Sequence, residues 1–74
     1  MVKPTRVTND IRRLRFANGE MTQAELAERV GVTRQTIIAI EQSRYSPSLE
    51  MAFRIARVFE VPLDELFRYP ESQP

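Results

Sequence analysis

Arginine is the residue type through which this sequence could do chemistry. Ten of its eleven Lys and Arg residues are Arg, whose planar guanidinium binds phosphate or guanine through paired hydrogen bonds better than a lysine does. The sequence contains no Cys and no His. A thiol nucleophile and a disulfide are therefore excluded, and the commonest metal ligand and general base are missing. We expect no enzyme activity, and nothing in the sequence indicates a cofactor or a metal site.

The basic residues are concentrated in the first part of the chain. The net charge is only +1, but residues 1–45 carry eight Lys and Arg against five acids, and residues 46–74 carry three against five. A basic patch, rather than the total charge, is what binds phosphate. The arginine bias therefore points to nucleic acid, although the base composition of the genome explains it equally well.

The size and composition describe one small globular domain. The 74 residues leave no room for a second domain, and 42% hydrophobic and 28% charged residues are ordinary values. No apolar run approaches the roughly 18 residues of a membrane span, and residues 1–10 lack the apolar segment of a signal peptide. We expect a cytoplasmic protein that does not contact a membrane.

Two short helices joined by a tight turn are predicted within residues 22–41. Thr22 and Glu25 form a capping box, in which each side chain binds the backbone amide of the other residue. An apolar face follows at helical spacing, and Gly31 can adopt the left-handed conformation that ends a helix. Thr33 is then suited to cap the second helix.

The second helix of this pair has two distinct faces. Ile37 and Ile40 are predicted to point into the core. The side chains predicted to point outward, at spacings that share one half of a helix, are Arg34, Gln35, Ile38 and Ala39. An outward isoleucine on a polar face indicates a contact surface, and additional core is the alternative.

Three further helices are expected. A first helix, capped by Asn9, extends to about Asn18 and is followed by a turn at residues 18–20. A short fifth helix follows Pro62. A fourth helix at about 48–59 presents a core stripe that consists of Leu49, Ala52, Ile55, Ala56 and Phe59. Met51 and Phe53 lie off that stripe, so they either widen the core or contact another chain.

Several motifs resemble those of the Cro/C1-type, or Xre-type, helix-turn-helix regulators. They are R-x-L-R, T-Q-x-E-L-A, G-V-T-R-Q-T-I, I-E-x-x-R-Y-x-P-S-L and A-x-x-I-A-R-V-F. The resemblance extends from about Asn9 to Phe67, and it is greatest to the small stand-alone dimeric members such as the cytolysin repressor. It implies an all-α, five-helix lambda-repressor-like DNA-binding domain at residues 9–67, with the motif at 23–41. Residues 1–8 form an N-terminal arm and residues 68–74 a tail, and a short terminal β-ribbon is compatible with both.

The resemblance also implies roles for individual residues. It predicts a sequence-specific transcriptional regulator, with repressor favoured over activator, that places helix 33–42 in the major groove. The residues implied to read bases are Arg34, Gln35, Ile38 and Ala39. Those implied to contact phosphate are Gln23, Thr33, Thr36, Gln42, Ser43, Arg44 and Tyr45. Those implied to hold the motif together are Ala27, Gly31, Ile37, Ile40 and the pair Arg15 and Glu41. The turn after the first helix is one residue longer than usual, which leaves the register of Arg12 and Arg13 against DNA open.

A homodimer on a two-fold operator is expected, because one such domain makes few contacts. The predicted dimer surface consists of Phe53, Leu63, Leu66, Phe67 and Tyr69, with a strand near Thr5–Val7 pairing with Phe67–Tyr69. The expected partners are double-stranded DNA and a second copy of the chain, with no small-molecule ligand. The alternative function is an antitoxin or adaptor whose helix-turn-helix domain mainly binds a protein partner.

Overall fold

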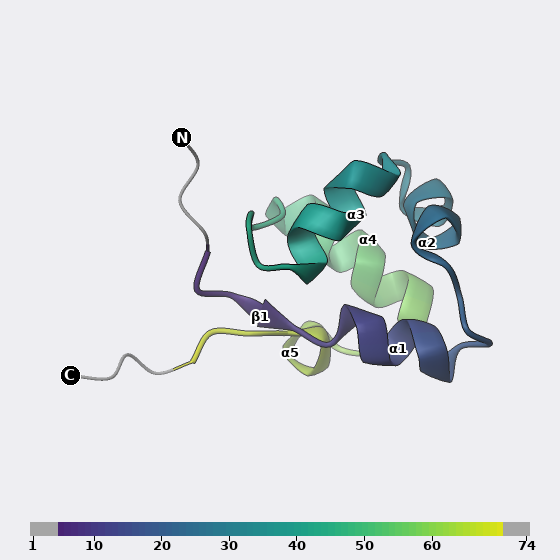
Figure 1. The fold of residues 1–74 in the computed structure, drawn as a ribbon. Helices are drawn as coiled ribbons and strands as arrows, with labels where there is room; N and C mark the ends of the chain where they lie inside the picture. Colours follow the sequence, from purple (N-terminus) through teal and green to yellow (C-terminus); the bar gives the residue numbers. More distant parts are fainter. Residues whose placement is uncertain (1–4, 71–74) are drawn as a thin grey trace.

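Five helices and a two-stranded ribbon make up the protein in the computed structural model, which describes residues 5–70 (Figure 1). In chain order they are β1 (Thr8–Asn9), α1 (Ile11–Ala17), α2 (Gln23–Val30), α3 (Arg34–Glu41), α4 (Leu49–Phe59), α5 (Leu63–Leu66) and β2 (Phe67–Arg68). The predicted five-helix architecture with a terminal ribbon is thereby confirmed. Residues 1–4 and 71–74, the ends of the predicted arm and tail, lie outside the described residues.

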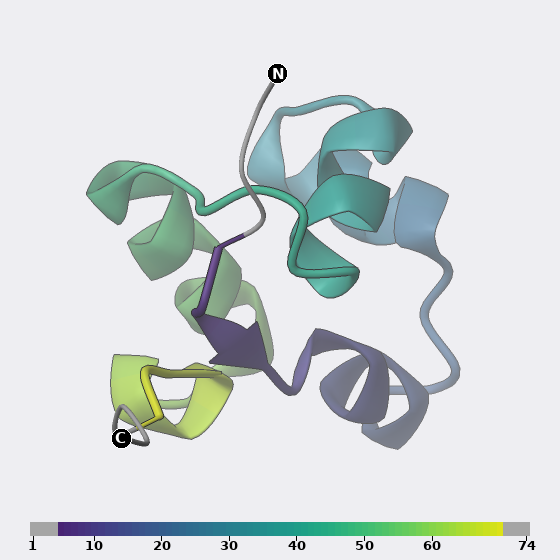
Figure 2. The same cartoon turned by 60° about the vertical axis from the view of Figure 1, so that its left-hand side comes forward.

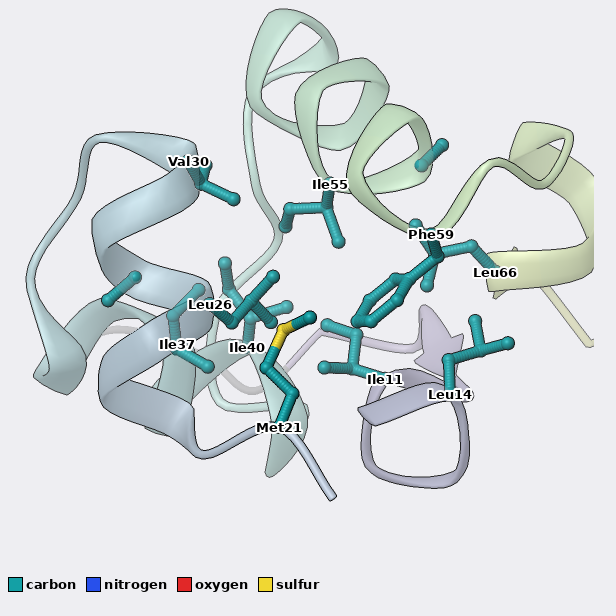
Figure 3. Close-up of a cluster of buried hydrophobic side chains, with 12 residues drawn as sticks. Ile11, Leu14, Met21, Leu26, Val30, Ile37, Ile40, Ile55, Phe59 and Leu66 are labelled. Atoms are coloured by element: carbon teal, nitrogen blue, oxygen red, sulfur yellow. The ribbon is translucent and has the colours of Figure 1, made fainter. Parts of the chain in front are cut away.

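The core is formed by side chains from all five helices, which meet between α1, α2, α3 and α4 (Figure 3). Its largest fully buried side chains are Ile11, Leu26, Ile37, Ile40, Ile55 and Leu66. Burying an aliphatic side chain of this size contributes about 1.5–3 kcal/mol. The isoleucines of α3 therefore hold one face of that helix firmly against the rest of the domain and leave the opposite face outside.

Two apolar positions differ from the prediction. Leu49 is 67% exposed rather than part of the core. It begins α4, and side chains on a helix lean toward its N-terminus, so Leu49 points past the end of the core. Leu66, which was predicted to lie in a dimer surface, is 0% exposed within the single chain. It therefore cannot contact a second copy and supports the surface from beneath.

The predicted signals at the ends of α2 and α3 are confirmed. The Thr22 hydroxyl accepts from the Glu25 amide at 3.0 Å, and the Thr22 amide donates to the Glu25 carboxylate at 2.8 Å. The backbone amide of Thr22, followed by its side chain, holds the pKa of the Glu25 carboxyl below its ordinary value. Gly31 ends α2 with a φ of 86°, and the Thr33 hydroxyl accepts from the Thr36 amide.

The ribbon lies nearer to α1 than predicted. The first strand is Thr8–Asn9 rather than Thr5–Val7, and it pairs antiparallel with Phe67–Arg68 of the same chain. Residues 5–7 do not join the ribbon because their backbone donors bind elsewhere: Thr5 N–H donates to the Ser43 carbonyl, and Val7 N–H to the Thr5 hydroxyl. The turned view in Figure 2 shows β1 beside α5.

Candidate nucleic-acid interface

The four residues predicted to hold α2 and α3 together lie on α2, in the turn after it and on α3. Ala27 is buried where α2 meets its neighbours, and Ile37 and Ile40 are buried from α3. Gly31 makes the turn with a left-handed φ that a residue with a side chain rarely adopts. These contacts leave the face of α3 that carries Arg34 and Gln35 exposed.

A buried ion pair locks α3 to α1, as the resemblance implied. Arg15 Nε lies 2.7 Å from Glu41 Oε2 and Arg15 Nη2 lies 3.2 Å from Oε1, a two-point contact that suits the guanidinium fork. Arg15 also donates to the Met21 carbonyl at 2.8 Å, and Gln23 Nε2 donates to Glu41 at 3.3 Å. Arg15 is 7% exposed. This pair therefore connects α1, the start of α2 and the end of α3.

The outward face of α3 carries polar side chains without partners. Arg34 and Gln35 are exposed, and within residues 5–70 their side chains make no hydrogen bond or ion pair. Ile38 and Ala39 are half-buried, between the core and the surface. The face thus combines two long hydrogen-bonding side chains with two apolar ones on a rigid helix.

The residues predicted to contact phosphate differ in whether their side chains are already hydrogen-bonded within the protein. Gln42, Arg44 and Tyr45 are exposed and their side chains make no hydrogen bond within the described part of the chain. Thr33 and Thr36 hydroxyls lie 3.0 Å apart beside the cap of α3. Two side chains are already engaged: the Gln23 amide binds Glu41, and the Ser43 hydroxyl donates to the Val7 carbonyl at 3.2 Å.

A hollow of about 620 Å³ lies beside this face, between α1, the start of α2 and α3. Gln23 and Arg34 line it, together with Arg12 and Phe16 of α1. The Arg12 guanidinium lies 5.7 Å from the centre of the exposed Phe16 ring, within the range of a cation–π contact. The sequence left the register of Arg12 open, and its spacing of four residues from Phe16 was the signal available for this contact.

The residues predicted to form the dimer surface line two separate hollows. Leu63, Phe67 and Tyr69 line one of about 410 Å³ beside the ribbon, together with Val7. Phe53 lines another of about 610 Å³ on α4, together with Leu49. Tyr69 and Phe53 are 67% and 54% exposed. The predicted set therefore falls on two surfaces, with Leu66 buried beneath one of them.

Neither a metal-binding cluster nor a membrane-spanning helix is found in the described part of the chain. No group of three or more Asp and Glu side chains there could hold a metal ion. None of the described helices is long and apolar enough to cross a membrane.

Comparison with known proteins identifies the family. The helix-turn-helix family model matches residues 11–66. This chain belongs to the Cro/C1-type helix-turn-helix family. Members of this family are DNA-binding transcription regulators and not enzymes, so the predictions of family, of DNA binding and of no enzyme activity are confirmed.

Three similar proteins illustrate the relationship. An uncharacterized HTH-type transcriptional regulator of Archaeoglobus fulgidus is 47% identical over 57 residues, which are 77% of this chain and 80% of the relative. The cryptic phage CTXphi transcriptional repressor RstR of Vibrio cholerae is 36% identical over 65 residues, 88% of this chain and 58% of RstR. The crystal structure of a candidate DNA-binding protein from Bacteroides fragilis matches with a TM-score of 0.72 and 27% identity, over 84% of this chain and 98% of that one.

Proposed function

We propose that this regulator is a homodimeric repressor that binds a two-fold operator and places one α3 helix of each subunit in the major groove. The observation that carries the proposal is the face of α3. Arg34 and Gln35 are exposed and have no partner within the described residues, whereas the opposite face of the same helix is buried. A rigid helix with unsatisfied donors is suited to read base edges.

Each side chain on this face matches a feature of the major groove. Arg34 can bind guanine O6 and N7 with two hydrogen bonds, and Gln35 can bind adenine N6 and N7. Ile38 and Ala39 offer apolar contact to a thymine methyl group. A good two-point contact discriminates against the wrong base by about 1–3 kcal/mol, so most of the sequence preference should come from Arg34 and Gln35.

Phosphate contacts are proposed for the loop after α3 and for the caps. Arg44 supplies a free cation, and Gln42 and Tyr45 supply free donors on the same loop. Thr33 and Thr36 contribute a hydroxyl proton that the bond between them leaves unused. Such contacts orient the protein on DNA without reading its sequence. Gln23 is retained as a phosphate contact through its position at the start of α2, where free backbone amides attract anions.

The proposed dimer surface is the apolar hollow beside the ribbon, which is lined by Val7, Leu63, Phe67 and Tyr69. Tyr69 offers a large apolar ring with a polar end, the kind of residue that interfaces favour. A two-fold dimer binds half-sites about 34–36 Å apart. The similarity to RstR, a transcriptional repressor, supports repression over activation, and occupying a promoter needs no additional domain. The proposal places the protein in the cytoplasm, with the DNA that it controls.

A second candidate function has one observation in its favour. Leu49 and Phe53 expose large apolar side chains on α4, away from the hollow beside the ribbon. Exposed apolar patches mark contact sites for proteins. An antitoxin or adaptor would use this surface to hold a protein partner.

The experiment that tests the proposal is selection of bound DNA from a random pool, combined with sedimentation of the protein at micromolar concentration. We expect a palindromic consensus with half-sites one helical turn apart, and a dimer in solution. A monomer that selects no consensus would refute the proposal and leave the protein-partner function as the better candidate.

A further inference from the structure

Asn9 connects three parts of the molecule, two through its side chain and one through its backbone. Its Oδ1 accepts from the amide of Ile11, the first residue of α1, at 3.1 Å, although the N-cap of α1 is Asp10 rather than Asn9 as predicted. Its Nδ2 donates to the Ile40 carbonyl in the last turn of α3 at 2.9 Å. Its backbone lies in β1 opposite Phe67 of β2. Asn9 therefore ties the end of the proposed reading helix directly to the ribbon.

Neighbouring residues reinforce this tie. The Ser43 carbonyl accepts from Thr5 N–H at 3.1 Å, and the Ser43 hydroxyl donates to the Val7 carbonyl. Ser43 has a φ of 57°, a conformation that is uncommon for a residue with a side chain and persists where surrounding contacts hold it. Residues 5–9 thus fasten both the end of α3 and the loop that carries Arg44 and Tyr45.

The ribbon at the other end of this tie borders the proposed dimer surface. Asp10 N–H donates to the Leu66 carbonyl at 2.9 Å, and the Asp10 carboxylate accepts from Arg68 at 2.8 Å. Phe67 and Tyr69 line the apolar hollow there. The path from the dimer surface to α3 therefore consists of β2, β1 and the Asn9 side chain, with a hydrogen bond at each step.

We propose that Asn9 is a positioning residue that sets the angle of α3 relative to the dimer surface, and thereby the half-site spacing that the dimer accepts. The inference rests on the proposed function. In a two-fold dimer, any rotation of α3 against the ribbon occurs in both subunits, so it changes the separation and the twist between the two reading helices. One base pair changes the separation by about 3.4 Å and the twist by about 34°. A rigid tie makes the dimer selective between such spacings.

The test compares affinity for three versions of the selected operator: the natural spacing, one base pair added and one removed. Asn9→Asp keeps the oxygen that accepts from the Ile11 amide and removes the donor to the Ile40 carbonyl. Asn9→Ala removes both. Asn18→Asp is the matched control, because it makes the same substitution at an exposed residue whose amide donates to the Leu14 carbonyl of α1, outside the ribbon. Thermal unfolding and sedimentation first establish which variants are folded and dimeric. The spacing preference is then compared among those variants.

We expect the wild type and Asn18→Asp to prefer the natural spacing by about tenfold or more, the cost of roughly one poorly met base contact. Asn9→Asp and Asn9→Ala should reduce this preference to within about threefold, with the base preference inside each half-site unchanged. Asn9 variants that keep the full spacing preference would overturn the inference while leaving the proposed function intact. A wild type without any spacing preference would instead count against the two-fold operator itself.

Discussion

Arg15 and Arg34 are the same residue type in opposite situations. Arg15 is 7% exposed and binds Glu41 and the Met21 carbonyl, whereas Arg34 is exposed and has no partner among residues 5–70. Burying a guanidinium is costly unless its donors are satisfied, so the first arginine can only be structural. The second lies on a helix that the first one fixes. An arginine is therefore available to contact DNA where the fold leaves its guanidinium without a hydrogen-bond partner.

The largest effect should come from breaking the buried pair. Glu41→Ala leaves the Arg15 charge buried without its partner, which costs about 3–5 kcal/mol. For a domain of this size we expect the melting temperature to fall by about 12 °C or more. Glu28→Ala, on the exposed side of α2, is the control and should change stability by less than about 0.5 kcal/mol.

Replacing both partners sharpens this prediction. A double variant, Arg15→Met with Glu41→Leu, removes the charges together and should recover most of the stability that Glu41→Ala loses. Thermal unfolding of the wild type, Arg15→Met, Glu41→Leu and the double variant measures the coupling between the two residues. Additive losses from the two sites would show that the pair does not act as a unit.

Exposed arginines should differ among themselves in DNA binding. Arg44→Ala removes a cation from the loop after α3 of each subunit, so affinity should fall to a similar degree on every sequence and the salt slope of the dimer should decrease by about 1.8. Arg57→Ala removes the same charge from the exposed surface of α4 and should leave the slope almost unchanged. Fluorescence titrations at several salt concentrations measure both. Equal slopes for the two variants would contradict a phosphate contact at Arg44.

A smaller loss of stability is expected from a residue that caps α2 and lies outside the proposed reading face. Thr22→Ala removes the hydroxyl that caps α2, at a cost of about 1 kcal/mol. Urea denaturation should detect this loss. The preference between operator bases should stay the same, because the reading face is on α3.

The smallest effect concerns the pH dependence of the ribbon. The hydrogen bond from Arg68, with that from Arg13, holds the pKa of Asp10 below its ordinary value. Because the folded-state pKa is lowered, the stabilisation is present above the unfolded-state pKa of about 4 and is lost as pH falls through the folded-state value. Wild type should therefore be slightly more stable than Asp10→Asn at pH 7, and the difference should disappear on acidification. A difference that grows below pH 4 would contradict this account.

Local signals made much of the motif predictable. The capping box of Thr22 and Glu25, the left-handed Gly31 and the cap at Thr33 each depend on residues a few positions apart, and all are present. Periodicity likewise identified Ile37 and Ile40 as core. The Arg15–Glu41 pair spans 26 residues, and only the resemblance to a known family indicated it.

Contacts distant in sequence explain what was missed. Leu49 and Leu66 are both apolar, but the position of each relative to the packed core decides that one is exposed and the other buried. The strand lies at Thr8–Asn9 because Ser43 binds the residues before it. The contact of Asn9 with Ile40 crosses 31 residues, and no spacing in the sequence indicates it.

The central claim is that the exposed face of α3 reads bases, and parallel selection of DNA by wild type and Arg34→Ala tests it most directly. Both proteins should be equally stable, because the Arg34 side chain is exposed and makes no hydrogen bond or ion pair within the described residues. We predict that Arg34→Ala loses preference at one position, repeated symmetrically in both half-sites, at a cost of about 1–3 kcal/mol for the preferred base. An unchanged consensus, or an equal loss of affinity on every sequence, would contradict the claim.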